Sequence, residues 1–386
     1  RSGNFWAVDL ISSYDRTFSS ISNGGNVIWN VPGTSSGNGT IVQGGNTLNY
    51  VGLASGFRGD TSTNGNKASN DMMDACHNLV FGGAGGKIVL QGSVDMGAGS
   101  LTFNSDYTLS NGGVAARRLN SAGFVVNKGA VLTTELTGAP GDEWRKIGEG
   151  TLIVAGSGNN SASLNVGGEG LVVLNRTGGA AAESVKLNGG NVIVRLMSAG
   201  QIRNGIVFGH RGGILDLYGT DMAASTITHL DNGAVFANLK PSSTSTWTYS
   251  GGTSTYLGSF TDGGSSAAGL LNVVVAPSSE QAVWTLSGDV DNKGSWAVNG
   301  GTLSVDGSPT IHAAGYVDPN DWQDAVFNTG NVSVKGGALF RAGAHSIVHS
   351  HIYVSNSGSY AIRESSLQKG DIVLQGSLSA YLADIR

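Results

Sequence analysis

The 386-residue sequence lacks the marks of several common protein classes. Cys76 is the only cysteine, so no disulfide can form within the chain, and we interpret it as a small buried or half-buried apolar side chain. No apolar run approaches the roughly 20 residues that a membrane helix requires. Charged residues make up only 13% of the chain, and the net charge of −5 comes without a basic stripe, which argues against a nucleic-acid partner.

Proline is also scarce, with 6 residues, whereas glycine is abundant, with 62. The apolar runs are short, rich in β-branched residues and bounded by Gly, Asn or Asp, and helix signals are nearly absent. A hydrophobic content of 39% is too high for a disordered Gly/Ser linker. The sequence therefore predicts an all-β protein. Gly-Gly pairs that can supply positive φ at corners occur at 82–83, 112–113, 189–190, 212–213, 300–301 and 336–337.

Glycine followed by strand-forming residues recurs along the middle of the chain at nearly constant spacing. The repeats begin at Gly129, Gly150, Gly170, Gly190, Gly213 and Gly233, at intervals of 21, 20, 20, 23 and 20 residues. A second, offset series begins at Ser163, Ser184, Gly205 and Ser225. Two strand series with one period predict a solenoid, in which each repeat is a coil stacked on the last and like side chains form ladders inside.

The repeat also suggests a division of the chain. We expect residues 1–80 to form irregular coils, a cap or a loop region, because an open solenoid end must protect its edge strands. We expect residues 81–386 to form the solenoid, with loops near 241–265 and 316–324. Because the chain starts at Arg1 without a methionine, we expect it to be a segment of a longer protein whose targeting signals lie outside it.

Several segments resemble one family of bacterial proteins. Residues 143–154 (EWRKIGEGTLIV) and 164–175 (LNVGGEGLVVLN) are similar to the "KIGEGTL…VGDGTVIL" region of serine protease autotransporters, the secreted proteases of enteric bacteria related to the immunoglobulin A proteases. Residues 208–219 (FGHRGGILDLYG) resemble their "YRGG-LD-NG" coil. The resemblance covers roughly residues 80 to 355. Further matches follow in the family's order at 230–238, 285–290, 301–313 and 321–322.

The resemblance implies a right-handed parallel β-helix that forms the stalk of a secreted passenger domain. Such passengers leave Gram-negative bacteria by type V secretion and reach the cell surface or the medium. In the family, a chymotrypsin-like serine protease precedes the stalk and a translocating β-barrel follows it. The sequence contains no Gly-Asp-Ser-Gly nucleophile motif, the nearest strings being Ser287-Gly-Asp-Val and Asp306-Gly-Ser-Pro. No catalytic residue of the family is therefore carried over.

A histidine group near the C-terminus offers one candidate for chemistry. His345, His349 and His351 share parity, so a continuous strand would place them on one face, where they could bind zinc or copper. Gly343 and the neighbouring turn residues favour the alternative, in which the strand is broken and the histidines face solvent or form a ladder.

An acidic loop and the tryptophans are the other candidates. Asp318, Asp321 and Asp324 lie beside Asn320, but the Pro-containing sequence lacks the tight, oxygen-rich loop that calcium requires, so we predict a solvated loop. The same carboxylates could serve a polysaccharide hydrolase or lyase.

We expect Trp322 to pack against a coil rather than act as a sugar platform. Core or corner packing is also expected for Trp144, Trp247, Trp284 and Trp296.

These observations lead to a prediction with alternatives. We predict no catalytic, metal-binding or cofactor-binding residue in this segment. The functional hypothesis is a stalk that supports and displays an upstream serine protease domain, with that domain and the translocator barrel as partners in the parent chain. One alternative is an adhesin or self-associating surface protein whose β-helix binds a host protein, a glycan or neighbouring cells. The other is a carbohydrate-active β-helix enzyme.

Overall fold

A computed structural model describes residues 15–22, 25–31, 39–50, 77–96, 99–230, 232–262, 269–311, 317–363, 365–376 and 379–383. These residues form strands, bridges, turns and bends without a helix, so the all-β prediction is confirmed. Within the same residues no helix is long and apolar enough to cross a membrane. The chain divides into two compact units, which are described separately. Unit 1 consists of Arg1–Val194 and Gly200–Asn204, and unit 2 of Arg195–Ala199 and Gly205–Arg386.

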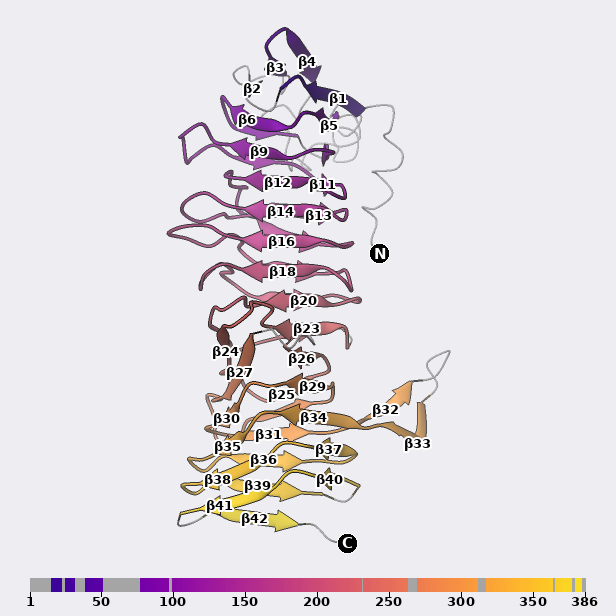
Figure 1. Cartoon of the computed structure of the whole chain (residues 1–386), viewed down its shortest axis with the longest axis vertical. Coiled ribbons are helices and arrows are strands. Elements are labelled where there is room, and N and C mark those ends of the chain that lie inside the picture. Colours follow the sequence, from indigo (N-terminus) through magenta and orange to yellow (C-terminus); the bar gives the residue numbers. More distant parts are fainter. Residues whose placement is uncertain are drawn as a thin grey trace, which may run out of the picture. The chain divides into compact units, whose positions relative to one another are not determined.

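Unit 1 consists of short strands that stack coil upon coil, most of them parallel (Figure 1). One sheet contains, in spatial order, β1 (Asp15–Ser20), β5 (Asn78–Gly83), β8 (Leu101–Phe103), β11 (Gly123–Val126), β13 (Glu143–Ile147), β15 (Ser163–Val166) and β17 (Val185–Leu187). A second contains β4 (Asn46–Tyr50), β3 (Gly39–Gln43), β2 (Asn26–Asn30), β6 (Gly86–Leu90), β9 (Tyr107–Ser110), β12 (Val131–Thr134), β14 (Thr151–Val154) and β16 (Leu171–Leu174). β10 (Leu119–Asn120) pairs with β7 (Val94–Asp95), and the unit boundary falls within β18 (Ile193–Leu196).

The 20-residue period sets the register of unit 1. Leu132 pairs with Leu152, and Leu152 pairs with Val172, in parallel strands of successive coils. All three side chains are fully buried, while the residues on either side of each are half-buried. This alternation is what a strand with one face toward the core requires. The predicted ladder of like side chains inside stacked coils is therefore confirmed in this unit.

Unit 2 is built in the same way from three main sheets. The first contains β20 (Gly213–Asp216), β23 (Ala234–Ala237), β26 (Ser259–Thr261), β29 (Val290–Asn292), β34 (Ala325–Thr329), β37 (Ser346–Val348) and β40 (Leu367–Gln368). The second contains β21 (Met222–Ala224), β24 (Thr244–Tyr249), β27 (Leu270–Val275), β30 (Trp296–Val298), β35 (Val332–Val334), β38 (Ile352–Ser355) and β41 (Ile372–Gln375). The third contains β25 (Ser254–Tyr256), β28 (Val283–Leu286), β31 (Thr302–Val305), β36 (Leu339–Ala342), β39 (Ser359–Ile362) and β42 (Ala380–Ala383), and β19 (Ile206–Phe208) pairs with β22 (Thr228–His229).

Aromatic rings fill much of the interior of unit 2. Tyr249 stacks on Trp284 with ring centroids 4.5 Å apart, and Trp284 lies 6.2 Å from Trp296. Trp296 in turn meets Phe327 at 5.0 Å in an edge-on arrangement. Such pairs add to the stabilisation that comes from area burial alone. The prediction of core packing is confirmed for the tryptophans that it named, since all of them are buried: Trp144, Trp247, Trp284 and Trp296.

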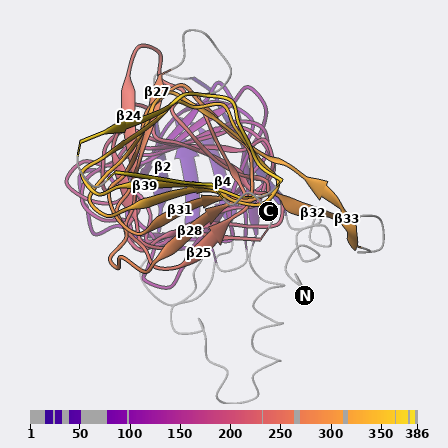
Figure 2. The same cartoon turned by 90° about the horizontal axis from the view of Figure 1, so that it is seen from below.

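A hairpin leaves the coils of unit 2. β32 (Ser308–Ile311) and β33 (Val317–Gln323) pair antiparallel, with Ser308 opposite Gln323 and a register shift between Pro309 and Ile311. The hairpin projects sideways from the coils of this unit (Figures 1 and 2). The loop expected near 316–324 thus coincides with β33 and the residue after it.

The other expected divisions remain predictions. The segment 241–265 contains β24, β25 and β26, each paired in parallel with a strand of an adjacent coil. Before residue 80, β1 pairs in parallel with β5, while β2, β3 and β4 form an antiparallel meander. Residues 51–76 lie outside the described residues, and Cys76, expected to be at least half-buried, is among them.

Candidate functional site

The three histidines singled out from the sequence lie on different segments of unit 2. His345 precedes β37 with a positive φ of 52°, His349 follows that strand, and His351 precedes β38. The metal hypothesis depended on one continuous strand, and that strand does not exist, because a turn precedes β37 and a bend separates it from β38. Across the described residues, no group of three or more His, Cys, Asp or Glu side chains is arranged to hold a metal ion.

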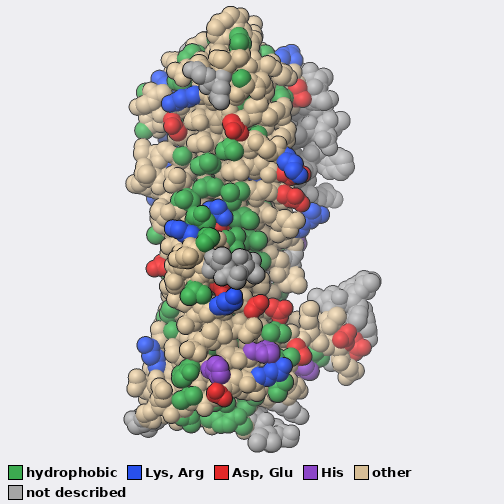
Figure 3. Space-filling view, in the orientation of Figure 1, with side chains coloured by type: hydrophobic (Ala, Val, Ile, Leu, Met, Phe, Trp, Pro, Cys, Tyr) green, Lys and Arg blue, Asp and Glu red, His purple; other side chains and the backbone are tan. Residues whose placement is uncertain are grey.

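His345 instead packs at the base of the hairpin. Its ring stacks on Trp322, with centroids 4.6 Å apart and planes 10° from parallel, and its Nδ1 atom lies 3.8 Å from Oδ1 of Asp324. Histidine side chains gather on the coils of unit 2 near this base (Figure 3). Trp322 keeps 36% of its surface exposed. The prediction that Trp322 packs against a coil is therefore correct only in part, since the ring contacts His345 and also reaches solvent.

The acidic residues of the hairpin serve local contacts. Asp318 Oδ1 accepts a hydrogen bond of 2.9 Å from the backbone N–H of Asn320, a contact within β33 itself. Asp324, the residue after β33, lies beside His345. Neither contact brings several oxygens together in the way that a calcium site needs. The absence of a catalytic or metal-binding role for this segment remains a prediction.

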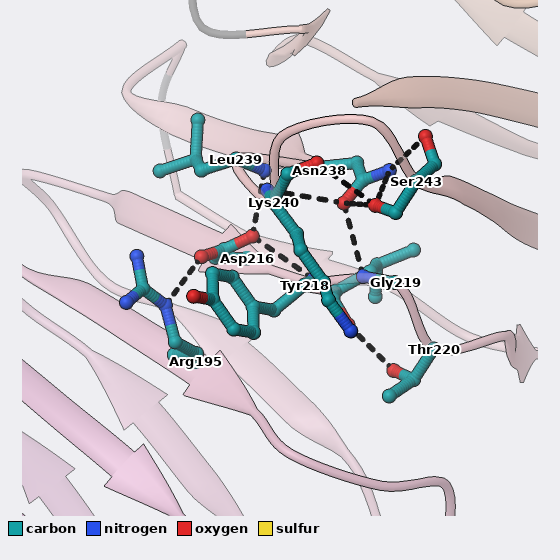
Figure 4. A network of polar contacts seen from close by, with 10 residues as sticks. Arg195, Asp216, Tyr218, Gly219, Thr220, Asn238, Leu239, Lys240 and Ser243 are labelled. Atoms are coloured by element: carbon teal, nitrogen blue, oxygen red, sulfur yellow. Dashed lines mark hydrogen bonds and ion pairs between the residues drawn. The ribbon is translucent and has the colours of Figure 1, made fainter. Parts of the chain in front are cut away.

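A second polar cluster of unit 2, which the sequence analysis did not single out, surrounds Asp216 at the end of β20 (Figure 4). The Asp216 side chain is fully buried. It accepts hydrogen bonds from Nε of Arg195 at 2.7 Å and from the backbone N–H groups of Tyr218 at 3.0 Å and Leu239 at 2.9 Å. A buried carboxylate needs such compensation, because leaving it unpaired would cost several kcal/mol.

Tyr218 lies next to two cations in this cluster. Cζ of Arg195 is 4.0 Å from the centroid of its ring, and Nζ of Lys240 is 5.6 Å from it, both within the range of cation–π attraction. Tyr218 has a φ of 47°, a left-handed conformation that is uncommon outside glycine. We call Arg195, Asp216, Tyr218 and Lys240 the cation–tyrosine cluster. The available sequence signal was Tyr218 itself, which stands where the quoted coil motif "LD-NG" has asparagine.

Two basic side chains point into the interior of unit 1 and contact backbone carbonyls. Nζ of Lys146 donates to the carbonyl of Gly148 at 2.5 Å and to that of Glu169 at 2.7 Å, and burial lowers the pKa of Lys146 to about 8. Burial also lowers the pKa of the Arg176 guanidinium. These side chains connect turns of successive coils. The Arg176 guanidinium donates to the carbonyls of Leu136, Ala155, Ser157 and Gly158.

Comparison with known proteins shows which proteins have related sequences. Residues 269–378 match a family model described as the PIC/HAP1/IgA0 second beta-solenoid repeat region. The chain is 33% identical over 250 residues to the serine protease SepA autotransporter of Shigella flexneri, a match that covers 61% of this chain and 17% of that protein. It is 27% identical over 328 residues to the adhesion and penetration protein autotransporter of Haemophilus influenzae, covering 74% of this chain and 23% of that protein. The chain thus spans less than a quarter of the length of these relatives.

A solved structure agrees over nearly the whole chain. The crystal structure of the Haemophilus influenzae Hap adhesin matches 94% of this chain and 44% of its own, with a TM-score of 0.78 and 22% identity. The chain is a β-solenoid segment of an autotransporter passenger domain. The predicted relationship and the parallel β-helix fold are thereby confirmed. As a passenger segment it is extracellular, either secreted or displayed on the bacterial surface.

Proposed function

We propose that this passenger segment is the stalk of a serine protease autotransporter and that it supports and displays a protease domain placed before it in the parent chain. The observation that carries the proposal is the 33% identity over 250 residues to the SepA autotransporter, a protein that is named a serine protease. On this proposal the parent is a chymotrypsin-like serine endopeptidase, and a translocator barrel follows the stalk.

The packing within each unit supports a mechanical role. Each strand bonds to its equivalent in the adjacent coils, so bending a coil out of line breaks backbone hydrogen bonds on two sides. Side chains add further ties between coils: the Asn160 amide accepts from the N–H of Gly138 at 2.8 Å and donates to the carbonyl of Ala181 at 2.9 Å. A buried amide satisfied by two neighbouring coils fixes their separation and register.

The stalk proposal is tested by deletions in the complete parent protein. Removing residues 151–170 deletes one coil, because Thr151 and Leu171 are register partners. We expect this variant to be secreted and to cleave a small peptide substrate at close to the wild-type rate, since every remaining strand keeps a partner. Removing residues 151–160 alone deletes β14 but keeps β15, so the remaining part of this coil is too short to pass once around the core. We expect secreted protein to fall at least about tenfold, because the coils on either side lose their shared neighbour.

Two outcomes count against the stalk. One is a parent reading frame without a serine nucleophile motif upstream of this segment. The other is a whole-coil deletion that abolishes cleavage of the small substrate while the protein is secreted and folded, which would place part of the catalytic machinery in the stalk.

An adhesive surface is the second candidate, and the projecting hairpin favours it. Val317 and Trp322 on β33 are exposed, although large apolar side chains are usually buried. The solved Hap adhesin supports this candidate by fold alone. The purified chain should then bind cultured epithelial cells, and replacing residues 308–323 by a short Gly/Ser linker should reduce binding several-fold without unfolding the coils. Equal binding by both chains would rule out the hairpin as the adhesive element.

A further inference from the structure

The cation–tyrosine cluster carries more positive charge than its own carboxylate neutralises. Oδ2 of Asp216 accepts from Arg195, and Oδ1 accepts from the backbone of Tyr218 and Leu239, so the carboxylate is fully engaged within the cluster. Lys240 is exposed, and within the described part of the chain it has no ion-pair partner. The local excess of charge stands out in a chain whose net charge is −5.

The conformation of Tyr218 indicates that its ring is held in place for a reason other than core packing. A non-glycine residue at a φ of 47° is strained, and Gly219, the next residue, is free to adopt such angles. Asparagine tolerates the left-handed region far better than tyrosine. The ring is only half-buried, so the cost is not offset by full burial in the core. What the ring contacts are the two cations, Arg195 and Lys240.

We propose that Arg195, Tyr218 and Lys240 form a binding site for an anionic group of an acidic glycan, either a carboxylate or a sulfate. Arg195 uses Nε for Asp216, and its two terminal nitrogens point away from that carboxylate (Figure 4). Such a planar pair of N–H donors matches two oxygens of one carboxylate or sulfate. Lys240 adds a second, exposed charge, and the Tyr218 ring lies beside both cations. The Arg195 side chain is 22% exposed, enough for its edge to be reached.

The size of the cluster favours a glycan over an acidic protein. A stable protein partner buries on the order of 1,000 Å² or more in total, whereas this site consists of one ring and two cations. One charged sugar of a polysaccharide presents one or two anionic groups on that scale. The passenger segment is extracellular, where polysaccharides with carboxylates or sulfates are accessible to it. The inference does not depend on whether the parent carries a protease.

The test measures binding of the purified 386-residue chain to three probes by calorimetry at low salt. Heparin oligosaccharides carry sulfates and carboxylates, hyaluronate oligosaccharides carry carboxylates alone, and dextran is neutral. We expect binding to at least one acidic probe and none to dextran, with affinity that falls as salt is added. Hyaluronate binding would identify the carboxylate as sufficient, and heparin binding alone would identify sulfate.

Two variants separate recognition from folding. Lys240→Ala and Tyr218→Asn should each weaken the affinity at least about fivefold, because each removes one contact worth about 1 kcal/mol. Tyr218→Asn should fold as well as the wild type, since asparagine accepts the left-handed conformation. Lys335→Ala is the matched control: it removes another exposed lysine of unit 2, in the turn after β35, and should leave the affinity unchanged.

Three results would overturn the proposal. The first is a wild-type chain that binds neither acidic glycan better than dextran. The second is unchanged affinity in both Tyr218→Asn and Lys240→Ala. The third is displacement of the glycan by poly-glutamate at equal charge concentration, which would make an acidic protein the better ligand.

Discussion

Arg176 and Gln201 bind each other in both directions inside unit 1. The backbone N–H of Arg176 donates to Oε1 of Gln201 at 2.8 Å, and Nε2 of Gln201 donates to the carbonyl of Arg176 at 2.9 Å. The Arg176 guanidinium meanwhile reaches the opposite way, as far as the carbonyl of Leu136 in the turn after β12. This pair of residues therefore connects turns that are separated by several coils, which backbone pairing alone cannot do.

Replacing Arg176 should be among the most damaging single changes in unit 1. Arg176→Met removes donors from four carbonyls and leaves buried acceptors unpaired, so we expect a loss of about 3–5 kcal/mol in the free energy of unfolding. Urea unfolding followed by circular dichroism measures it. Arg203→Met is the control, because Arg203 is more than half exposed in its pair with Glu183, and its removal should change stability by less than about 1 kcal/mol. Similar losses in the two variants would contradict the assignment.

Stability should rise with pH above neutrality through Lys146. In the folded chain the pKa of Lys146 is lowered to about 8, whereas the unfolded value is 10.5. Between these values the unfolded state holds more protons, so raising the pH favours folding, and the penalty of burying the charge is fully present only below about 8. From pH 7 to 9.5 this gain is roughly 2 kcal/mol.

The contribution of Lys146 is isolated by comparison with Lys146→Met. As the pH is raised, the free energy of unfolding of the wild type should increase relative to that of this variant. A difference that stays constant from pH 7 to 9.5 would mean that Lys146 is not perturbed in the folded state.

Two glycines with left-handed backbones should respond differently to a methyl group. A Cβ on Gly123 would collide with the backbone of Arg145 in the next coil, whereas a Cβ on Gly129 would meet nothing within 4 Å. We expect Gly129→Ala to cost about 1 kcal/mol for the unfavourable φ, and Gly123→Ala to cost at least about 2 kcal/mol more, because two coils must separate. Thermal unfolding of the purified variants measures which of the two loses more stability. Equal losses would show that the close contact between Gly123 and the next coil does not add to the cost.

Replacement of two tryptophans of unit 2 should lower stability by different amounts, because one lies in the core and the other in the hairpin. Trp284→Ala empties a fully buried site among stacked rings and should cost about 3–5 kcal/mol. Trp322→Ala removes an exposed ring that stacks on His345, and we expect a global loss of about 1 kcal/mol or less. Limited proteolysis between residues 308 and 323 should nevertheless become faster. A large global loss for Trp322→Ala would show that the hairpin is part of the cooperative core.

The sequence predicted the coils well because their pattern is local and repeated. Residues such as Leu152 and Val172 recur at a spacing of 20 and alternate with half-buried neighbours, so both the fold and the inward face could be derived from it. Lys146 could not be placed in the same way, because a lysine in a strand is normally solvent-facing. Its burial depends on two carbonyls, one of them in another coil, that accept from it.

The candidate sites were harder to predict than the fold. The parity of His345, His349 and His351 assumed an uninterrupted strand, and the left-handed conformation at His345 ended it. The hairpin was expected to be a loop because its Pro, Asn and Asp residues are typical of turns, yet pairing with β32 makes residues 317–323 a strand. Arg195 and Asp216 lie 21 positions apart, about one period of the repeat, so the repeat could place them in neighbouring coils. It could not show that the Tyr218 ring contacts both Arg195 and Lys240.

The antiparallel meander of unit 1 bears on how separate molecules meet. β2 pairs in parallel with β6 on one side but antiparallel with β3 on the other, and β3 then pairs antiparallel with β4. A stack of parallel coils is a template on which another chain could continue the cross-β lattice without limit. Because the sheet ends on β4, which runs antiparallel to β3, another coil cannot continue the parallel ladder here in the way that the coils within the unit do. The meander therefore disfavours the end-to-end stacking of separate passenger molecules into fibrils at this edge.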